Sequence, residues 1–538
     1  MRRLEEHRTL LGKGYEKAIA LFSRFEPYFW VALLAVQVCI NIAINFTANA
    51  SSLDNDAAKL YTHVVEFCRS GFLFGDWTYM TTLEADCSAL LAVPFYLLTK
   101  DISLSFAFAN TILMGLAIAL FFHIGKKCGF RIKHACIAAL LLILPYAIGQ
   151  LEYFNMLFYH GGQYVVKAIV PLLLLDLLLS KHGYSIVDKV IFGFYCFFLL
   201  LTTISSGIYV FLCGILPLLA VQFLRIFVTK KETLTLRSAL LCGVTLLLTL
   251  IGFLVSKLLS ANMANDMELF TGDWYSKVVV VLTGFFRLFG AWLAQESIKI
   301  LTFHGVFRIV LFLFVAFLIG TIVYVAKNIK HDKSGLFAYL LVLFFFNCFV
   351  LVFSKMGYVA GFKHRYHIIG AVGLFLLAAC AIKALGHCSE QGIRRFSKAV
   401  SLLCAILLVL SCNFFAFETL EEKPAAPQQE VCASLQEDVT LVIVYDDSGT
   451  AELCRAIDSE RIYLNCNEVG VPSGNYDYYL HTNEKSFTDG FETHCMLVLK
   501  SKIDDFWSRF PYVKENGYSL VSETEKYYVF RGGNYYFA

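Results

Sequence analysis

Charged residues are scarce in this sequence of 538 residues. Asp, Glu, Lys and Arg make up 16% of the chain and hydrophobic residues 58%, whereas soluble globular domains contain about 25% charged and about 45–50% apolar residues. The shortage of charge excludes an ordinary soluble protein. The net charge is only +3, so the chain also lacks the positive excess with which proteins bind the phosphates of nucleic acids.

Motifs for structural metal ions are missing as well. The sequence contains no CxxC spacing with partner histidines, which is the usual pattern of a zinc site. Most of its 17 cysteines lie within apolar runs, where a cysteine acts as a small hydrophobic residue. Four others lie near the C-terminus and leave three possible pairings open: Cys432, Cys454, Cys466 and Cys495.

The sequence does contain many long apolar runs with few charges, which are interpreted as membrane spans when they reach about 18 residues. We predict an α-helical polytopic membrane protein with eleven transmembrane helices. These are Trp30–Phe46, Ile102–Gly125, His134–Gln150, Tyr164–Ser180, Val190–Ser205, Gly207–Val228, Ser238–Ser260, Phe303–Ala326, Gly335–Phe353, Tyr366–Leu385 and Val400–Phe417. The weakest boundary is at Thr202–Gly207, where turn residues supply the only break.

Basic residues indicate the orientation of these spans. Lys and Arg are retained on the cytoplasmic side of short loops. In this chain they are concentrated before the first span and in alternate loops, of which Lys126–Lys133 is the first. The N-terminus is therefore predicted to be cytoplasmic and the C-terminus extracytoplasmic, in a multi-pass protein of the cell membrane. Residues 47–101 form the first outer loop in this arrangement.

The first outer loop contains two predicted helices. Apolar residues recur at helical spacing from Ala57 to Cys68, with polar residues mostly on the opposite face, which is typical of an amphipathic helix. Gly71 is expected to close this helix. The segment Ser88–Thr99 is apolar but too short to cross a bilayer, so it suits a helix that lies along the membrane surface.

The composition changes after Phe417. Residues 421–430 are a polar, proline-bearing linker. Beyond the linker we predict strands at Thr440–Tyr445 and Arg461–Leu464, helices at Ala451–Asp458 and Ile503–Phe510, and a hairpin of Tyr518–Val521 with Tyr527–Arg531. The chain thus divides into a transmembrane domain over residues 1–420 and a small extracytoplasmic α/β domain over residues 431–538.

Two acidic clusters stand out in the first outer loop. Asp54 and Asp56 precede the amphipathic helix, where an acidic residue usually acts as a cap, but at the mouth of a membrane bundle a carboxylate is also placed to act as a base. Glu84 and Asp86 would point the same way in an extended segment and converge on a ligand. The alternative for this second cluster is that Asp86 caps the helix Ser88–Thr99.

Basic residues at the start of the tenth span form a third candidate: Lys363, His364 and Arg365. Such cations often anchor a span at the level of the lipid headgroups. The orientation rule, however, disfavours basic residues on the outer side, and Arg suits bidentate contacts to phosphate. This cluster is therefore a candidate phosphate site.

Other polar residues near the spans are weaker candidates. His160 is followed by two glycines, Gly161 and Gly162, which permit a close approach of the backbone, so His160 is a candidate substrate contact. Lys167 and Asp176 lie near span ends, and we interpret them as charges that reach the membrane interface.

Together these features resemble the GT-C class of integral membrane glycosyltransferases. The similarity is to bacterial members that are related to protein O-mannosyltransferases and to the aminoarabinose transferase of lipid A. It is carried by the acids at Asp54 and Asp56, the segment Trp77–Asp86, the surface helix after it, and Phe362–Tyr366 at the start of a late span. The chain departs from the family pattern in its second acid, which stands at Asp56 because Asn55 follows Asp54.

The resemblance implies transfer of a hexose or pentose from a polyprenyl-phosphate-linked donor to a hydroxyl of a glycan, lipid or protein, on the outer face of the membrane. Asp54 would be the base, with Asp56 as the alternate. Glu84 and Asp86 would orient the acceptor or hold a divalent cation. Only a hard ion such as Mg²⁺ or Mn²⁺ suits carboxylates without histidines.

The lysine, histidine and arginine of the third cluster would hold the donor phosphate. The alternative function is a transporter or flippase for a lipid-linked glycan. A transporter concentrates polar residues along the interior of its spans, whereas this chain concentrates them in the outer loops, which favours an enzyme.

Overall fold

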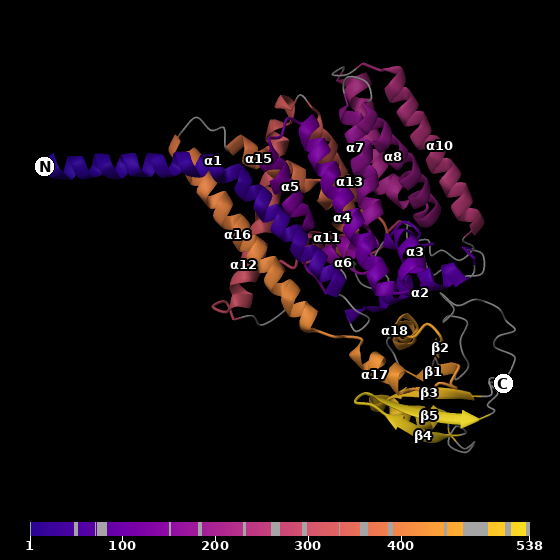
Figure 1. Ribbon diagram of the computed structural model, residues 1–538. Helices are drawn as coiled ribbons and strands as arrows, with labels where there is room; N and C mark the ends of the chain where they lie inside the picture. Colours follow the sequence, from indigo (N-terminus) through magenta and orange to yellow (C-terminus); the bar gives the residue numbers. More distant parts are fainter. Residues whose placement is uncertain are drawn as a thin grey trace.

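The structure is a computed structural model that describes residues 2–47, 52–69, 71–72, 83–149, 152–180, 185–229, 233–259, 269–292, 299–332, 334–355, 364–385, 391–445, 449–465, 493–509, 511 and 518–533. Most of it is helical (Figure 1). The helices up to the middle of the chain are α1 (Arg2–Thr47), α2 (Asn55–Arg69), α3 (Ser88–Thr99), α4 (Ile102–Lys127), α5 (Ile132–Ile143), α6 (Tyr153–Phe158), α7 (Val165–Leu179), α8 (Ile186–Ser206), η2 (Phe211–Ile215), α9 (Leu216–Phe223), η3 (Leu224–Val228) and α10 (Leu236–Leu259).

The later helices of the bundle are α11 (Trp274–Leu288), α12 (Phe303–Asn328), η4 (Ile329–His331), α13 (Leu336–Phe353), η5 (His364–His367), α14 (Ile368–Val372), α15 (Leu374–Leu385) and α16 (Gln391–Glu421). The C-terminal part then adds α17 (Ala426–Ser434), α18 (Thr450–Ile457), η6 (Lys500–Lys502) and α20 (Ile503–Arg509). Helix α17 begins inside the segment 421–430 that the composition marks as a linker.

A sheet of five strands forms the C-terminal domain. The strands are β1 (Leu441–Tyr445), β2 (Ile462–Asn465), β3 (Thr493–Leu499), β4 (Ser519–Glu523) and β5 (Tyr527–Gly533), in the order β2-β1-β3-β5-β4. Strand β1 pairs in parallel with both β2 and β3, while β5 runs antiparallel to β3 and β4. The predicted α/β domain with its C-terminal hairpin is confirmed, and β3 is an additional central strand.

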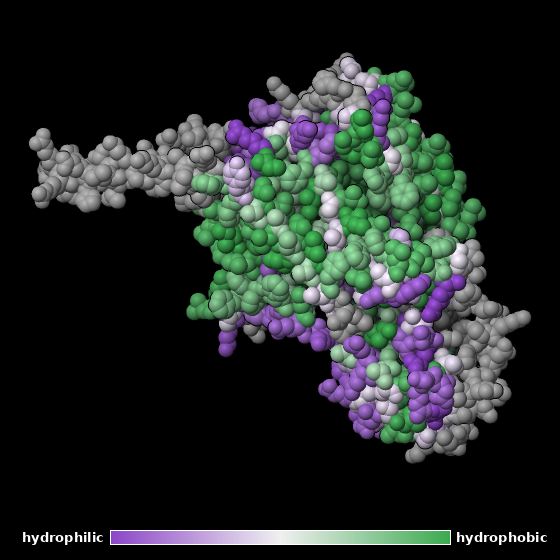
Figure 2. Space-filling view, in the orientation of Figure 1, coloured by the Kyte–Doolittle hydropathy of each residue, from purple (hydrophilic) through white to green (hydrophobic). Residues whose placement is uncertain are grey.

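Eight helices in the described part of the chain are long and apolar enough to cross a membrane, and the bent pair of His364–Val372 with Leu374–Leu385 makes a ninth if it counts as one span. Apolar side chains cover the middle of the bundle, while polar ones gather at its two ends and over the C-terminal domain (Figure 2). Exposed leucines and phenylalanines, such as Leu254, Leu313 and Phe349, are what a lipid-facing surface requires. The protein is a multi-pass membrane protein.

Helix length accounts for the difference from the predicted eleven spans. Helix α5 has only 12 residues and α7 has 15, so neither is long enough to cross the membrane by itself. Helix α5 ends early because Pro145 follows Leu144, whose ψ of 138° is extended, as the residue before a proline prefers. The predicted break after α8 is confirmed, since Gly207 has a φ of +58°.

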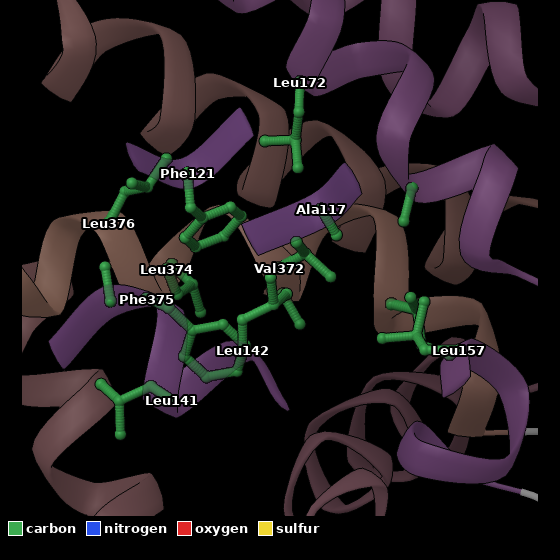
Figure 3. Packing of buried hydrophobic residues seen from close by; sticks show 14 of the residues in the cluster. Ala117, Phe121, Leu141, Leu142, Leu157, Leu172, Val372, Leu374, Phe375 and Leu376 are labelled. Carbon is green, nitrogen blue, oxygen red and sulfur yellow. The ribbon is translucent and has the colours of Figure 1, made fainter. Parts of the chain in front are cut away.

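One large apolar core holds the bundle together. Phe121 of α4, Leu142 of α5, Val372 of α14 and Phe375 of α15 pack against one another in its middle (Figure 3). A polar pair connects α1 to α16: the Gln37 amide of α1 exchanges hydrogen bonds with Asn413 of α16, at 3.1 and 2.7 Å. Hydrogen bonds of this kind contribute to the association of helices in lipid, where apolar burial alone provides little driving force.

Charged side chains within the bundle form ion pairs with one another, and this pairing accounts for their charges without contact to the membrane interface. Asp176 is fully buried and bonds to His123 at 2.8 Å and to Lys127 at 2.5 Å, and the Lys127 ammonium also reaches Asp188 at 2.7 Å. Lys167 is likewise buried, and its ammonium lies 3.0 Å from Asp86. The interpretation of Lys167 and Asp176 as charges that reach the interface is therefore wrong, because each is paired with a counter-ion on a neighbouring element.

Helices α2 and α3 lie at the end of the bundle that carries the C-terminal domain (Figure 1); we call this end the domain side. Helix α2 packs against the bundle through Tyr61, whose ring stacks on Phe106 of α4 at a centroid distance of 4.3 Å. The predicted helix in this loop is thus confirmed as α2, and the second one coincides with α3.

The C-terminal domain is docked directly on α2. Leu453 and Ala456 of α18 belong to the same buried cluster as the apolar face of α2, and Arg69 at the end of α2 donates to the Ser459 carbonyl at 2.7 Å. Gly449, just before α18, has a φ of +61°, and a Cβ at this position would overlap the amide of Asn55. The C-terminal domain is therefore in close contact with the first turn of α2.

We predict that Gly449→Ala loosens this contact. Alanine at positive φ costs about 1–2 kcal/mol, and its Cβ would push Asn55 away. Hydrogen–deuterium exchange of the purified protein should become faster in α2 and α18. The double variant Asn55→Ala/Gly449→Ala should recover part of the protection, because the overlap is removed. Gly243→Ala is the control, since a Cβ there meets nothing within 4 Å. Unchanged exchange in Gly449→Ala would contradict the docking described here.

Candidate active site

An ion pair joins the start of α2 to the start of the bent pair of helices. The Arg365 Nη1 atom of η5 lies 2.7 Å from the Asp56 Oδ2 atom, and the two side chains are 12% and 25% exposed. A charge-assisted bond of this length is stronger than a neutral hydrogen bond. Of the candidate residues predicted from the sequence, the structure thus brings Asp56 and Arg365 together.

Asp54 stands beside this pair and caps α2. Its Oδ1 atom accepts a hydrogen bond from the Ala57 backbone N–H at 2.8 Å, which confirms the capping role expected for this cluster. Burial raises the pKa of Asp54 to about 6, and the Asp56 charge adds to this effect, while the Ala57 N–H and the Arg365 charge lower it. The carboxylate is therefore mostly ionised at pH 7 and is basic for an aspartate.

Glu152 is a further acidic residue at this site, and no sequence motif marks it. It precedes α6, its Oε1 atom lies 3.9 Å from the His364 Nε2 atom, and its Oε2 atom is buried without a hydrogen-bond partner in the described part of the chain. Burial raises the pKa of Glu152 to about 8, although Arg365 and Arg287 lower it. Glu152 is thus protonated at neutral pH.

Two basic residues flank this glutamic acid. His364 is half-buried at the start of the bent pair of helices. The Arg287 Nε atom is buried and has no hydrogen-bond partner among the described residues. In the sequence, Glu152 is an isolated acidic residue in a short loop between two apolar runs. A charge in such a place is energetically costly and often has a functional role, so this pattern could have indicated the residue.

His160 connects the second loop to the start of α2. Its Nε2 atom lies 3.0 Å from the Ser52 carbonyl, and burial lowers the pKa of the ring to about 4, so the neutral ring donates from Nε2. The two glycines after it permit close packing, because a Cβ at Gly161 would overlap Leu60 of α2 and one at Gly162 would overlap Ser88 of α3. His160 thus helps to fix the segment that precedes α2.

The second acidic cluster has another arrangement than predicted. Glu84 has a φ of +51° and is followed by a turn, so the segment is not extended, and strand geometry does not place the two carboxylates on one face. Asp86 is fully buried and accepts hydrogen bonds from Ser205 at 3.0 Å and Ser206 at 2.7 Å. The alternative role for Asp86 is also wrong, because Cys87 caps α3. This cluster ties the first loop to α7 and α8.

Two further predictions concern a lysine and a metal ion. Lys363 lies outside the described residues. Within the described ranges, one group of three potential ligands converges, namely His123, Asp176 and Asp188. The Lys127 ammonium already contacts both of these aspartates, so a cationic side chain offsets part of their charge. The group holds α4, α7 and α8 together.

The site as a whole combines three chemical groups on the domain side of the bundle: an ionised carboxylate of raised basicity, a protonated carboxylic acid, and a guanidinium at the start of the bent pair of helices. A base, a proton donor and an anion-binding group are the requirements of group transfer from a phosphate.

The fold that holds this site is the GT-C fold of integral membrane glycosyltransferases. The aminoarabinose transferase ArnT from Cupriavidus metallidurans in the apo state is 12% identical, with a TM-score of 0.58 over 93% of this chain and 98% of that chain. The same protein bound to undecaprenyl phosphate is 12% identical, with a TM-score of 0.54 over 92% and 97%. The predicted resemblance is confirmed at the level of the fold.

A third structure extends this similarity. The oligosaccharyltransferase from Archaeoglobus fulgidus is 13% identical, with a TM-score of 0.53 over 95% of this chain and 75% of that chain. No family profile and no curated protein sequence matches the chain. The arrangement of helices is therefore shared where sequence similarity is low.

The protonation state of Glu152 provides a direct test of the site. Because its pKa is raised to about 8, the side chain should hold its proton below pH 8 and lose it as the pH rises through that value. Infrared difference spectra of the purified protein should show a protonated carboxyl band at pH 7 that disappears above pH 8. The band should be absent in Glu152→Gln at every pH. A Glu152 band that is already lost at pH 6 would contradict this description.

Proposed function

We propose that the protein is a glycosyltransferase that moves a sugar from a polyprenyl-phosphate-linked donor to a hydroxyl acceptor on the outer side of the membrane. The domain side corresponds to the outer side, with the N-terminus in the cytoplasm, as the distribution of basic residues predicts. The GT-C fold and the ArnT complex with undecaprenyl phosphate support a lipid-linked donor.

One observation carries this proposal: a basic carboxylate and a guanidinium come together where the lipid bilayer meets the domain side. Asp54 and Asp56 lie at the start of α2, and Arg365 lies at the start of the bent pair of helices. A polyprenyl-phosphate donor has its phosphate at headgroup depth and its chain between the lipids. A site with an arginine at that depth suits such a molecule, and a soluble nucleotide-linked donor would not require it.

The chemistry follows from these positions. Asp54 takes the proton of the acceptor hydroxyl while the acceptor oxygen forms a bond to the anomeric carbon. The bond from that carbon to the phosphate oxygen breaks, and polyprenyl phosphate leaves as an anion beside Arg365. Negative charge on the phosphate grows as the bond breaks, so its contact with Arg365 strengthens towards the transition state. The proton of Glu152 is available to hydrogen-bond a substrate oxygen.

The test of this function is product formation by the purified protein. Reconstituted in lipid with a polyprenyl-phosphate-linked sugar, it should release polyprenyl phosphate only when a hydroxyl acceptor is present. Movement of the intact lipid across the bilayer without release of polyprenyl phosphate would support the transporter instead and would end the enzyme proposal.

Asp54→Asn should reduce turnover by about 10²–10⁴-fold, the usual contribution of a general base. Asparagine keeps the size of the side chain and an oxygen that can cap α2, so the fold should be retained. In the wild type, turnover should rise as the pH increases through about 6, where Asp54 ionises. Asp101→Asn is the matched control, because Asp101 caps α4 in the same way, through the Leu104 N–H at 3.0 Å. Normal turnover in Asp54→Asn would refute the assignment.

Arg365→Lys should raise the KM for the donor by about tenfold, since lysine keeps the charge but loses the two parallel bonds of the guanidinium. Arg365→Ala should be affected more strongly. Arg69→Lys is the control, because Arg69 is an exposed residue at the other end of α2 that pairs with Glu66. If Arg365 only anchors the helix in the interface, the lysine variant will have the KM of the wild type.

Chelation distinguishes Arg365 from a divalent cation as the partner of the phosphate. Mg²⁺ or Mn²⁺ would take carboxylate oxygens, and the carboxyl groups that interact with Arg365 include those of Asp54, Asp56 and Glu152. We expect turnover to persist in EDTA, because Arg365 already neutralises Asp56. Loss of turnover in EDTA that added Mg²⁺ or Mn²⁺ restores would assign the phosphate to a metal ion.

A further inference from the structure

A cavity of about 280 Å³ opens on the domain side, apart from the contacts described for the site. It lies between the first turns of α12, the last turns of α16 and the loop that follows α5. Exposed apolar residues stand close by, among them Phe303 and Phe417, so the mouth of the cavity is at the level where lipid meets water. Its volume is near the lower end of the range for small-molecule pockets, which suits a group the size of one monosaccharide.

The wall of this cavity carries polar groups of both signs. The His304 Nε2 atom lies 2.8 Å from the Glu418 Oε1 atom, and the Arg308 Nη1 atom donates to the Gly290 carbonyl at 2.6 Å. Glu422 adds a second carboxylate to the wall. The carboxylates outnumber the permanent cation, so the cavity disfavours an anionic ligand.

Tyr146 is the strongest sign that the cavity takes a ligand. It lines the cavity, it is only 1% exposed, and its hydroxyl has no hydrogen-bond partner among the described residues. A buried hydroxyl without a partner costs free energy unless a bound molecule satisfies it. The hydroxyl can both donate and accept a hydrogen bond.

The backbone around Tyr146 is held in an uncommon conformation. Ala147 has a φ of +48° although it is not a glycine, and Gly149, at +81°, lies so close to α16 that a Cβ would be 2.5 Å from Thr419. Strain of this kind persists where the surrounding structure fixes it, and it is concentrated at functional sites. The cavity is therefore a fixed feature of the fold.

Two segments connect the cavity to the candidate active site. Gly149 lines the cavity and stands three residues before Glu152, and Gly290 lines it and stands three residues after Arg287. A molecule in the cavity is thus next to the elements that carry the proton donor and one of its flanking cations.

We propose that this cavity binds a neutral, hydroxyl-bearing ring of monosaccharide size, and that it does so as part of the acceptor. The second half of this proposal rests on the proposed glycosyl transfer, while the first half does not. Ring hydroxyls can donate to Glu418 and Glu422 and exchange hydrogen bonds with Tyr146. The apolar face of a sugar ring can lie against an aromatic side chain such as Phe415, which also lines the cavity.

Saturation-transfer NMR of the full chain in lipid nanodiscs tests the binding without turnover. The probes are methyl β-D-glucopyranoside, methyl β-D-galactopyranoside and methyl α-D-mannopyranoside, with inorganic phosphate and ethanolamine as charged competitors. At least one glycoside should receive saturation from the protein, and neither charged competitor should displace it. Transfer to none of the three glycosides, or displacement by phosphate or ethanolamine, would overturn the proposal.

Two variants locate the binding in the cavity. Tyr146→Phe removes a single oxygen that makes no hydrogen bond within the described protein, and Glu422→Gln removes one charge. Each should raise the dissociation constant of the glycoside by about tenfold, which corresponds to the loss of one hydrogen bond. Glu421→Gln, at the exposed neighbouring position outside the cavity, should leave it unchanged. Equal affinity in all three variants would overturn the assignment to this cavity.

A kinetic measurement separates this proposal from the function on which it partly rests. In the polyprenyl phosphate release assay with a glycolipid acceptor, Tyr146→Phe should raise the KM for the acceptor and leave the KM for the donor unchanged. Release with wild-type KM values in Tyr146→Phe would overturn the acceptor role while the enzyme function stands. Absence of release in the wild type, with glycoside binding intact, would instead refute the enzyme function alone.

Discussion

The ion pair between Asp56 and Arg365 is the contact on which the candidate site depends. It joins residues 309 positions apart and connects a helix outside the membrane to the first turn of a broken span. Both partners are fixed independently, since Tyr61 stacks α2 on α4 and the His367 Nε2 atom lies 2.9 Å from the Val281 carbonyl of α11. The site is therefore preorganised, which lowers the cost of stabilising charge in the proposed reaction.

The environment gives two acidic residues different protonation states at neutral pH. Asp54 is hydrogen-bonded at a helix N-terminus and close to a guanidinium, so its pKa rises only to about 6. Glu152 has an oxygen without a partner in a buried position, and its pKa rises to about 8. Groups whose environments separate their pKa values in this way can divide the roles of base and proton donor.

Much of the fold was predictable because its signals are local. Spans appear as apolar runs, α3 has the bounds expected from its composition, and the acid before α2 acts as the expected cap. Strand β3 was missed because a short apolar run such as Met496–Leu499 does not distinguish a strand from a helix. Glu152 was missed, and the extended arrangement of Glu84 and Asp86 was wrong, because burial and a left-handed φ at Glu84 depend on tertiary contacts.

We propose that Arg365 binds the donor phosphate and that Asp56 holds the guanidinium in place until the donor arrives. Binding of undecaprenyl phosphate to the reconstituted protein, compared between the wild type, Asp56→Asn and Arg365→Ala, tests it most directly. Asp56→Asn frees the guanidinium, so it should bind the lipid at least as tightly as the wild type, whereas Arg365→Ala should bind about tenfold more weakly or worse. Equal weakening in both variants would show that the pair serves only to hold the structure together and would contradict the account.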